Sequence, residues 1–182
     1  NGHLLPATPN LRVFDLNGDE AEVLHRAMDL ERGADRFYTA LRGRHQAEPW
    51  AASLEALAGA EQGHARLIFS HWVTRIANPP SFEQLYHTLA GDIVEGGYSC
   101  EGLLAMLAEQ AEPTCRVVLE MALDVEYSAY DLSRNLAHRF HDTPLASIFN
   151  TIAEAEKEHM RLVAQALTLW LQRRPNLLRA LS

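Results

Sequence analysis

The sequence contains little cysteine and no long apolar run. Only Cys100 and Cys115 are present among 182 residues, so the chain has neither a Cys-x-x-Cys pair nor a disulfide framework. This usage favours a reducing, cytoplasmic location over secretion. No uninterrupted apolar stretch approaches the roughly 20 residues that span a bilayer, so we expect no membrane segment. The chain begins with Asn1 and not with methionine, which leaves open that it is part of a longer protein.

The chain also lacks an excess of basic residues. Its 24 acidic and 16 basic residues give a formal net charge of −8, which repels nucleic acid and anionic membranes. We therefore expect neither as a partner. There is no Gly-rich phosphate loop and no Gly-x-Ser-x-Gly turn, so the motifs of nucleotide binding and of serine hydrolases are missing.

Two copies of one spacing do run through the chain. Each copy is a glutamate followed 30 positions later by a Glu-x-x-His motif, and the second copy stands 95 positions after the first. The residues are Glu31, Glu61 and His64 in the first copy and Glu126, Glu156 and His159 in the second. Other pairs share the offset of 95, among them Leu24 with Leu119 and Pro49 with Pro144. Chance rarely keeps register over so long a stretch, so the sequence predicts a duplicated helical hairpin.

Apolar periodicity predicts four long helices and no strand. The first is expected over residues 19–45, with a capping box at Asp19 and Glu22, and the second over residues 49–76, with Pro49 in its first position. The third and fourth are expected to open at Pro113 and at Asp142 to Pro144, and the last to end near Gln172. The crossover between the second and third helices is expected to hold a short helix capped by Ser81 and Gln84, a break at Gly96 and Gly97, and another helix near residues 101–110.

These elements predict an all-α four-helix bundle made of two hairpins joined by a long crossover with short helices. We expect one domain over residues 19–172, an irregular lead over residues 1–18 and a tail over residues 173–182. Residue 46 is midway between Glu31 and Glu61, and residue 141 is midway between Glu126 and Glu156. Since both arms of a hairpin rise equally per residue, all four carboxylates should lie at one level of the core.

Carboxylates on the apolar faces of helices need compensating charge. An ionised group buried without a partner costs several kcal/mol at least, and the predicted inner faces contain no Lys or Arg. Protons or bound cations must therefore supply the positive charge, and four glutamates balance two divalent ions. Glu and His three positions apart are neighbours on a helix and can bind one ion together. A mixed set of carboxylate and imidazole ligands suits iron, with manganese as the alternative, better than calcium or structural zinc.

This constellation resembles the ferritin-like di-iron carboxylate proteins and, within them, the rubrerythrin group. The likeness covers about residues 19–172 and includes the segment from Glu31 to Tyr38 and an alanine before both Glu61 and Glu156. The resemblance implies a ferritin-like bundle with two iron ions. It implies that Glu61 and Glu156 bridge the ions, while the remaining four residues are terminal ligands: Glu31, Glu126, His64 and His159. Tyr38 resembles the family's tyrosine that hydrogen-bonds near the site, although a large core residue at helical spacing explains it equally well.

Two departures from the family pattern matter. Typical rubrerythrins carry a further carboxylate one turn before the position of Glu126, where this chain has Leu123, which puts the metal-shuttling form of peroxide reduction in doubt. They also carry a Cys-rich rubredoxin module, which two scattered cysteines do not build. Reducing electrons would therefore come from another protein.

The resemblance implies a non-haem di-iron protein that reacts with hydrogen peroxide or dioxygen, as a peroxidase or ferroxidase in oxidative-stress defence or iron handling. One alternative is a di-iron monooxygenase acting on an organic or lipid-like substrate, which should have an apolar channel to the metals. The other is a non-catalytic iron-binding or sensing module. Bundles of this type often pair, so a homodimer is expected.

Overall fold

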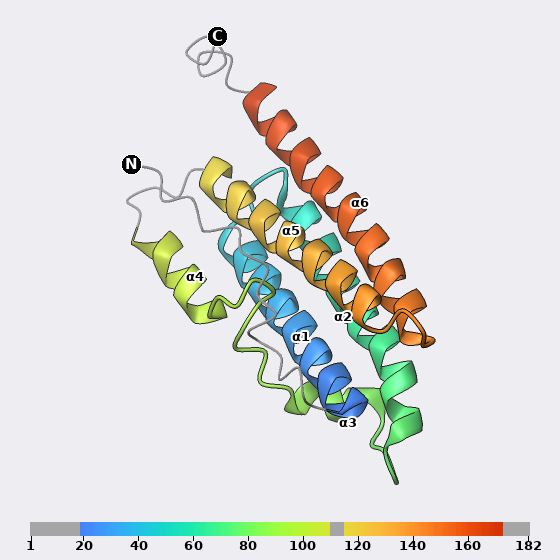
Figure 1. Ribbon diagram of the computed structural model, residues 1–182. Helices are drawn as coiled ribbons and strands as arrows, with labels where there is room; N and C mark the ends of the chain where they lie inside the picture. The colour runs from blue at the N-terminus through green and yellow to red at the C-terminus, as the bar shows by residue number, and fades with distance from the viewer. Residues whose placement is uncertain (1–18, 110–114, 173–182) are drawn as a thin grey trace.

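The computed structural model describes residues 19–109 and 115–172 and is all-helical over them (Figure 1). The long helices are α1 (Glu20–Arg44), α2 (Ala51–Trp72), α5 (Cys115–Arg139) and α6 (Leu145–Gln172), and a 3₁₀ turn (Val73–Arg75) follows α2. The crossover holds the short helices α3 (Phe82–Thr88) and α4 (Cys100–Ala108). The described residues contain no strand, only one isolated bridge between Ile93 and Ser99. The prediction of an all-α chain is confirmed, and the arrangement is compatible with a ferritin-like bundle.

The four long helices form two hairpins that lie side by side (Figure 1). α1 packs along α2, and α5 packs along α6, as the sequence repeat predicted. The short helices α3 and α4 both contact α1. None of the described helices combines the length and the apolar character needed to cross a lipid bilayer.

Two helix starts follow the predicted capping boxes. At α1 the Glu22 amide donates to Asp19 Oδ1 at 2.8 Å, and the Asp19 amide donates to Glu22 Oε2 at 3.2 Å. At α3 the Gln84 amide donates to Ser81 Oγ at 3.2 Å, and the Ser81 amide donates to Gln84 Oε1 at 2.9 Å. Each box satisfies amide groups that have no partner inside the helix.

The second helix starts later than the sequence predicted. α2 begins at Ala51, and Pro49 lies in the preceding turn instead of in the first helical position. Trp50, between them, has φ −93° and ψ 0°, outside the helical range, and its buried ring packs 4.9 Å from that of His45. Packing of this tryptophan therefore sets where the helix begins. The predicted start at Pro113 lies outside the described residues.

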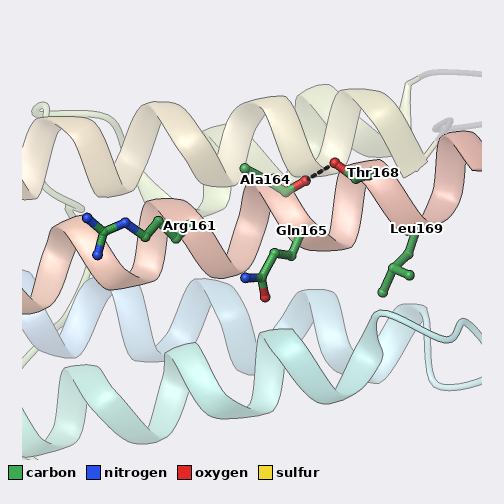
Figure 2. A pocket seen from close by; sticks show the side chains of 5 residues that line it. All are labelled: Arg161, Ala164, Gln165, Thr168 and Leu169. Carbon is green, nitrogen blue, oxygen red and sulfur yellow. Dashed lines mark hydrogen bonds between the residues drawn. The ribbon is translucent and has the colours of Figure 1, made fainter.

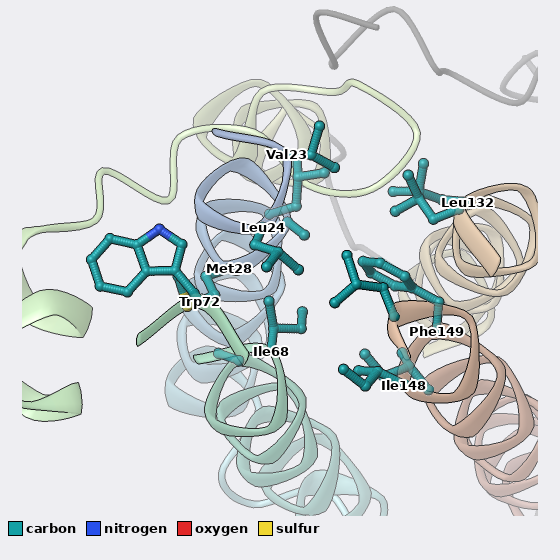
Figure 3. Packing of buried hydrophobic residues seen from close by; sticks show 14 of the residues in the cluster. Val23, Leu24, Met28, Ile68, Trp72, Leu132, Ile148 and Phe149 are labelled. Atoms are coloured by element: carbon teal, nitrogen blue, oxygen red, sulfur yellow. The ribbon is translucent and has the colours of Figure 1, made fainter. Parts of the chain in front are cut away.

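The core consists of two apolar clusters stacked along the bundle axis. The first cluster draws on the early part of α1 and α6 and the late part of α2 and α5, and Figure 3 shows Leu24 and Ile68 facing Phe149 across it. The second cluster draws on the other halves of the same helices and includes Phe37 and Leu119. Between the two, each long helix carries a short stretch that belongs to neither cluster, and all six residues of the repeated spacing lie in these stretches. The core therefore consists of two apolar blocks with a polar layer between them.

Replacing Phe149 with alanine is expected to lower the free energy of unfolding by about 3–5 kcal/mol, because its fully buried ring would leave a cavity. Chemical denaturation of the metal-free protein measures this. Leu169→Ala is the control, since that side chain is 60% exposed and its loss should change stability by less than about 0.5 kcal/mol. An equal loss in both variants would contradict the described core.

Candidate metal centre

The two copies of the repeated spacing converge in the middle of the bundle. One set of donor atoms comes from Glu31, Glu61, His64 and Glu156, and a second comes from Glu61, Glu126, Glu156 and His159. Within each set the donor atoms all lie within 4.8 Å of one another. Glu61 and Glu156 belong to both sets, so the structure presents two adjoining groups that share two carboxylates.

The layer is nearly closed to water. Glu156, Glu126 and Glu61 are at most 2% exposed, and Glu31 and His64 are also buried. The side chain of His159 is 12% exposed, slightly more than that of His64 at 10%. The imidazoles therefore form the side of the cluster nearest to solvent.

Both imidazoles direct Nδ1 at the carboxylates. Nδ1 of His64 lies 3.3 Å from Glu31 Oε2, 3.2 Å from Glu61 Oε2 and 3.0 Å from Glu156 Oε1. Nδ1 of His159 lies 2.9 Å from Glu126 Oε2 and 2.8 Å from Glu156 Oε2. The two rings are stacked, with centroids 5.3 Å apart.

Crowding of carboxylates shifts the pKa values of the whole cluster. Burial raises the pKa of Glu31 to about 7, although His64 opposes the shift, and burial together with neighbouring carboxylates holds the pKa values of Glu61 and Glu126 well above their usual range. For Glu156, burial is outweighed by the hydrogen bond to His159 and by the neighbouring His64, which lower its pKa to about 2. The four carboxylates therefore differ in acidity, and Glu156 is the most acidic of them.

The same interactions hold protons on the imidazoles. Burial alone would lower the pKa of His159, but hydrogen bonds to Glu126 and Glu156 outweigh it and raise the pKa to about 10. For His64, burial also opposes protonation. The charge of Glu31 and the other carboxylates around His64 Nδ1 outweigh burial and raise the pKa of His64. These protons supply the positive charge that the buried carboxylates require.

The donor set fits bound cations better than it fits protons. Glu31 Oε2 and Glu156 Oε1 are buried without a hydrogen-bond partner, although His64 Nδ1 lies within 3.3 Å of both. One N–H does not satisfy three carboxylates that surround it. A divalent ion offers several coordination positions to the same oxygens, so four carboxylates and two imidazoles match two such ions in charge and in ligand type.

Tyr38 contacts the layer from α1. Its side chain is fully buried, and its hydroxyl donates to Glu126 Oε1. Burial and the charge of Glu126 hold the pKa of the phenol well above its usual value, so it stays a proton donor. The residue 95 positions later is Ser133, also buried, whose short side chain does not repeat the phenol. The two halves of the layer therefore differ, and a catalytic role for Tyr38 stays a prediction.

The sequence-based analysis missed one buried carboxylate, Glu95, in the crossover between α3 and α4. It is 3% exposed, and it lies outside both four-residue donor sets. Burial, followed by the charge of Glu61, raises its pKa well above the usual range. Because the crossover is not part of the duplication, no partner at the repeat offset marks Glu95. The only local signal is the Gly96-Gly97 turn that follows it.

Surface cavities lie elsewhere on the bundle. A shallow groove of about 500 Å³ follows the exposed side of α6, lined by Arg161, Ala164, Gln165, Thr168 and Leu169 (Figure 2). A second cavity of about 180 Å³ lies beside Trp50 and Trp170. None of the six clustered residues lines either cavity, so neither provides the channel that a monooxygenase would need.

Comparison of the chain with family models, with curated proteins and with solved structures finds no match. What the layer can do must therefore be argued from its own residues. They form a buried cluster of carboxylates and imidazoles that can hold metal.

The metal-free protein should lose stability as the pH rises from about 6 to 9. With folded pKa values of about 7 for Glu31 and about 10 for His159, against ordinary values of 4.5 and 6.5, the folded chain holds protons that the unfolded chain has released. For each extra proton in the folded chain, the free energy of unfolding falls by about 1.4 kcal/mol for every unit by which the pH rises between the unfolded and the folded pKa. This range is pH 4.5 to 7 for Glu31 and pH 6.5 to 10 for His159. Glu156, with its lowered pKa of about 2, acts in the opposite sense only below about pH 4.5.

Thermal unfolding of chelator-treated protein across this range measures the effect. Two equivalents of Mn²⁺ should raise the melting temperature, and by more at pH 8 than at pH 6, because the metal displaces these protons. A melting temperature of the metal-free protein that rises with pH would contradict the described protonation.

Proposed function

We propose that this chain is a non-haem di-iron protein of rubrerythrin-like type that reacts with hydrogen peroxide or dioxygen, as a peroxidase or ferroxidase. The observation that carries the proposal is the pair of adjoining donor sets that share Glu61 and Glu156 in a buried layer. In this proposal the two shared carboxylates would be ligands of both ions. Glu31 and His64 complete one ligand set, and Glu126 and His159 complete the other.

Iron suits this donor set, with manganese as the alternative. Three carboxylates and a single imidazole in each donor set favour a metal that accepts both oxygen and nitrogen ligands. Two ferrous ions, when bound, supply the two electrons that reduction of an O–O bond requires. The apolar clusters on both sides of the layer exclude bulk water, which strengthens the electrostatic interactions inside it.

The chain's own groups have distinct roles in this proposal. Tyr38 fixes the orientation of Glu126 through its hydroxyl and holds a proton at that oxygen beside the site. The imidazoles His64 and His159 are slightly more exposed than the carboxylates beside them, and each would hold one ion. A small molecule such as peroxide or dioxygen needs no large channel, whereas a lipid-like substrate does. The near-complete burial of the six donor residues therefore suits a small oxidant better than a lipid-like substrate.

The proposal includes partners that the chain does not supply. Electrons for repeated turnover would come from an external donor protein, because a peroxidase must be reduced again after each reaction. A homodimer in the cytoplasm stays part of the proposal as a prediction.

The direct test is metal analysis of protein purified without chelator, followed by rapid mixing of the ferrous protein with peroxide and with oxygen. We expect two iron ions per chain and a fast oxidation that consumes oxidant. Two bound ions that oxidise no faster than free ferrous iron would favour the non-catalytic binding or sensing module instead. Fewer than two ions per chain at saturation would contradict the di-iron assignment.

Replacing Glu61 or Glu156 with alanine is expected to abolish binding of two metal ions, because each carboxylate belongs to both donor sets. Metal content after equilibration with excess ferrous iron, under anaerobic conditions, measures the result. The matched controls are Glu55→Ala on α2 and Glu154→Ala on α6, both exposed glutamates on the same helices. Two ions in either bridging variant would count against the proposal.

Replacing Tyr38 with phenylalanine is expected to keep two metal ions but to slow oxidation of the ferrous protein by about tenfold or more, as loss of a positioned proton donor does. The substitution keeps the ring and removes only the hydroxyl that donates to Glu126. Phe37→Leu, a change in the neighbouring fully buried ring, is the packing control. An unchanged rate in Tyr38→Phe would show that the tyrosine only fills the core.

A further inference from the structure

The crossover brings a further carboxylate close to the buried layer. Neither carboxylate oxygen of Glu95 has a hydrogen-bond partner, although the side chain is almost completely buried. Burial is the largest cause of the raised pKa of Glu95, and the charges of Glu61, Glu156 and Glu126 also raise it. The backbone of Glu95 itself acts in the opposite direction. Glu95 in turn raises the pKa of Glu31. Glu95 therefore lies within electrostatic reach of all four carboxylates of the layer.

Contacts on two sides place Glu95 at the seam between the hairpins. On one side, a Cβ atom built on Gly33 of α1 would lie only 2.1 Å from the carbonyl oxygen of Ile93. On the other, a Cβ atom built on Gly96 would lie 3.0 Å from the hydroxyl oxygen of Ser128 on α5. Ile93 and Gly96 lie on either side of Glu95 in sequence, so this segment contacts α1 before Glu95 and α5 after it. Figure 1 shows the crossover passing beside α1.

These contacts lie at the level of the carboxylate layer. Gly33 follows Glu31 by two positions, Ser128 follows Glu126 by two, and the two positions are separated by the same offset of 95. Two residues correspond to about 3 Å of rise along a helix. The crossover thus meets the two hairpins at equivalent points, each next to a carboxylate that belongs to only one donor set.

Specific hydrogen bonds hold this segment in place. Asp29 Oδ1, on α1, accepts a hydrogen bond from the Gly91 amide at 2.9 Å, and the guanidinium of Arg36 donates to the Gly91 carbonyl at 3.0 Å and to Asp92 Oδ1 at 2.9 Å. After Glu95 the chain turns through two glycines with positive φ, Gly96 at 92° and Gly97 at 81°. Two hydrogen bonds close this turn. The Val94 amide donates to the Tyr98 carbonyl at 2.9 Å, and the Gly97 amide donates to the Val94 carbonyl at 3.0 Å. A fixed turn therefore holds an unpartnered carboxylate beside the layer.

We propose that Glu95 is an additional metal ligand of this centre, supplied by the crossover and entering between α1 and α5. The inference rests on the proposed function, because it requires the six bundle residues to hold metal. It gives the site five carboxylates and two imidazoles, and the seventh group comes from outside the four long helices. Since Glu95 stands outside both compact donor sets, its loss should weaken one ion without emptying the site.

The test is Glu95→Gln, which keeps the size of the side chain and removes its ability to ionise. Metal-free protein is titrated with Co²⁺ without oxygen, by calorimetry and by the visible absorption of the bound ion. We expect two ions in the variant, one of them bound about 10–100-fold more weakly, with an altered spectrum. The metal-free melting temperature should stay within about 2 °C of that of the unchanged protein, because glutamine has nearly the same shape and volume as the glutamate that it replaces.

Two further variants separate the role of Glu95 from general effects of charge and packing. Glu101→Gln removes an exposed glutamate on α4 and should leave both affinities unchanged. Gly33→Ala keeps every ligand but pushes the Ile93 backbone away from α1, so it should weaken the same ion as Glu95→Gln.

The outcomes distinguish the two proposals. If the unchanged protein binds two ions and Glu95→Gln binds both with the same affinity and spectrum, the ligand role of Glu95 is overturned and the proposed function stands. Equal weakening in Glu95→Gln and Glu101→Gln would also overturn it, since that result reflects net charge alone. If the unchanged protein binds no metal, both proposals fail.

Discussion

The structure depends on one electrostatic constraint, which is the burial of four glutamates at one level of a helical bundle. Carboxylates at most 6% exposed lie between two apolar clusters, and each lies within reach of the charge of its neighbours. Such a layer is stable only with compensating positive charge, from protons or from cations. The raised pKa values of both imidazoles and of three of the glutamates show how the chain meets this need with protons. Two divalent ions would meet the same need while also satisfying the carboxylate oxygens that lack hydrogen bonds.

Duplication explains why the layer exists, and departures from duplication explain why its halves differ. The six donor residues repeat at an offset of 95, so two similar hairpins supply matching groups at the same height. Tyr38 donates to Glu126, but the equivalent residue in the second half is Ser133, which has no phenol. Asp29 is buried and anchors the crossover, while its counterpart Asp124 is exposed. The crossover itself has no copy. The two donor sets therefore have similar ligands and different surroundings, which suits a centre whose two positions have different roles.

The crossover is a structural part of the site and not only a connection between hairpins. Close packing on Gly33, the hydrogen bonds of Asp29 and Arg36, and the two-glycine turn hold it across α1 and α5. These features require particular residues at particular positions, which a flexible linker would not. They place Glu95 where it adds to the negative charge of the layer, and that addition is unfavourable unless metal or protons are present.

The sequence by itself determined the helical hairpins, the capping boxes of α1 and α3 and the convergence of six donors, because periodicity and a repeated spacing are local or internal to the chain. It did not determine the start of α2, where the packing of Trp50 prevails over the preference of Pro49 for a first helical position. Nor did it reveal Glu95, because a lone glutamate in a connecting segment has neither a periodic face nor a repeat partner. Only the tertiary structure decided that this residue is buried beside the other carboxylates, since its burial depends on contacts between the crossover and helices distant from it in sequence.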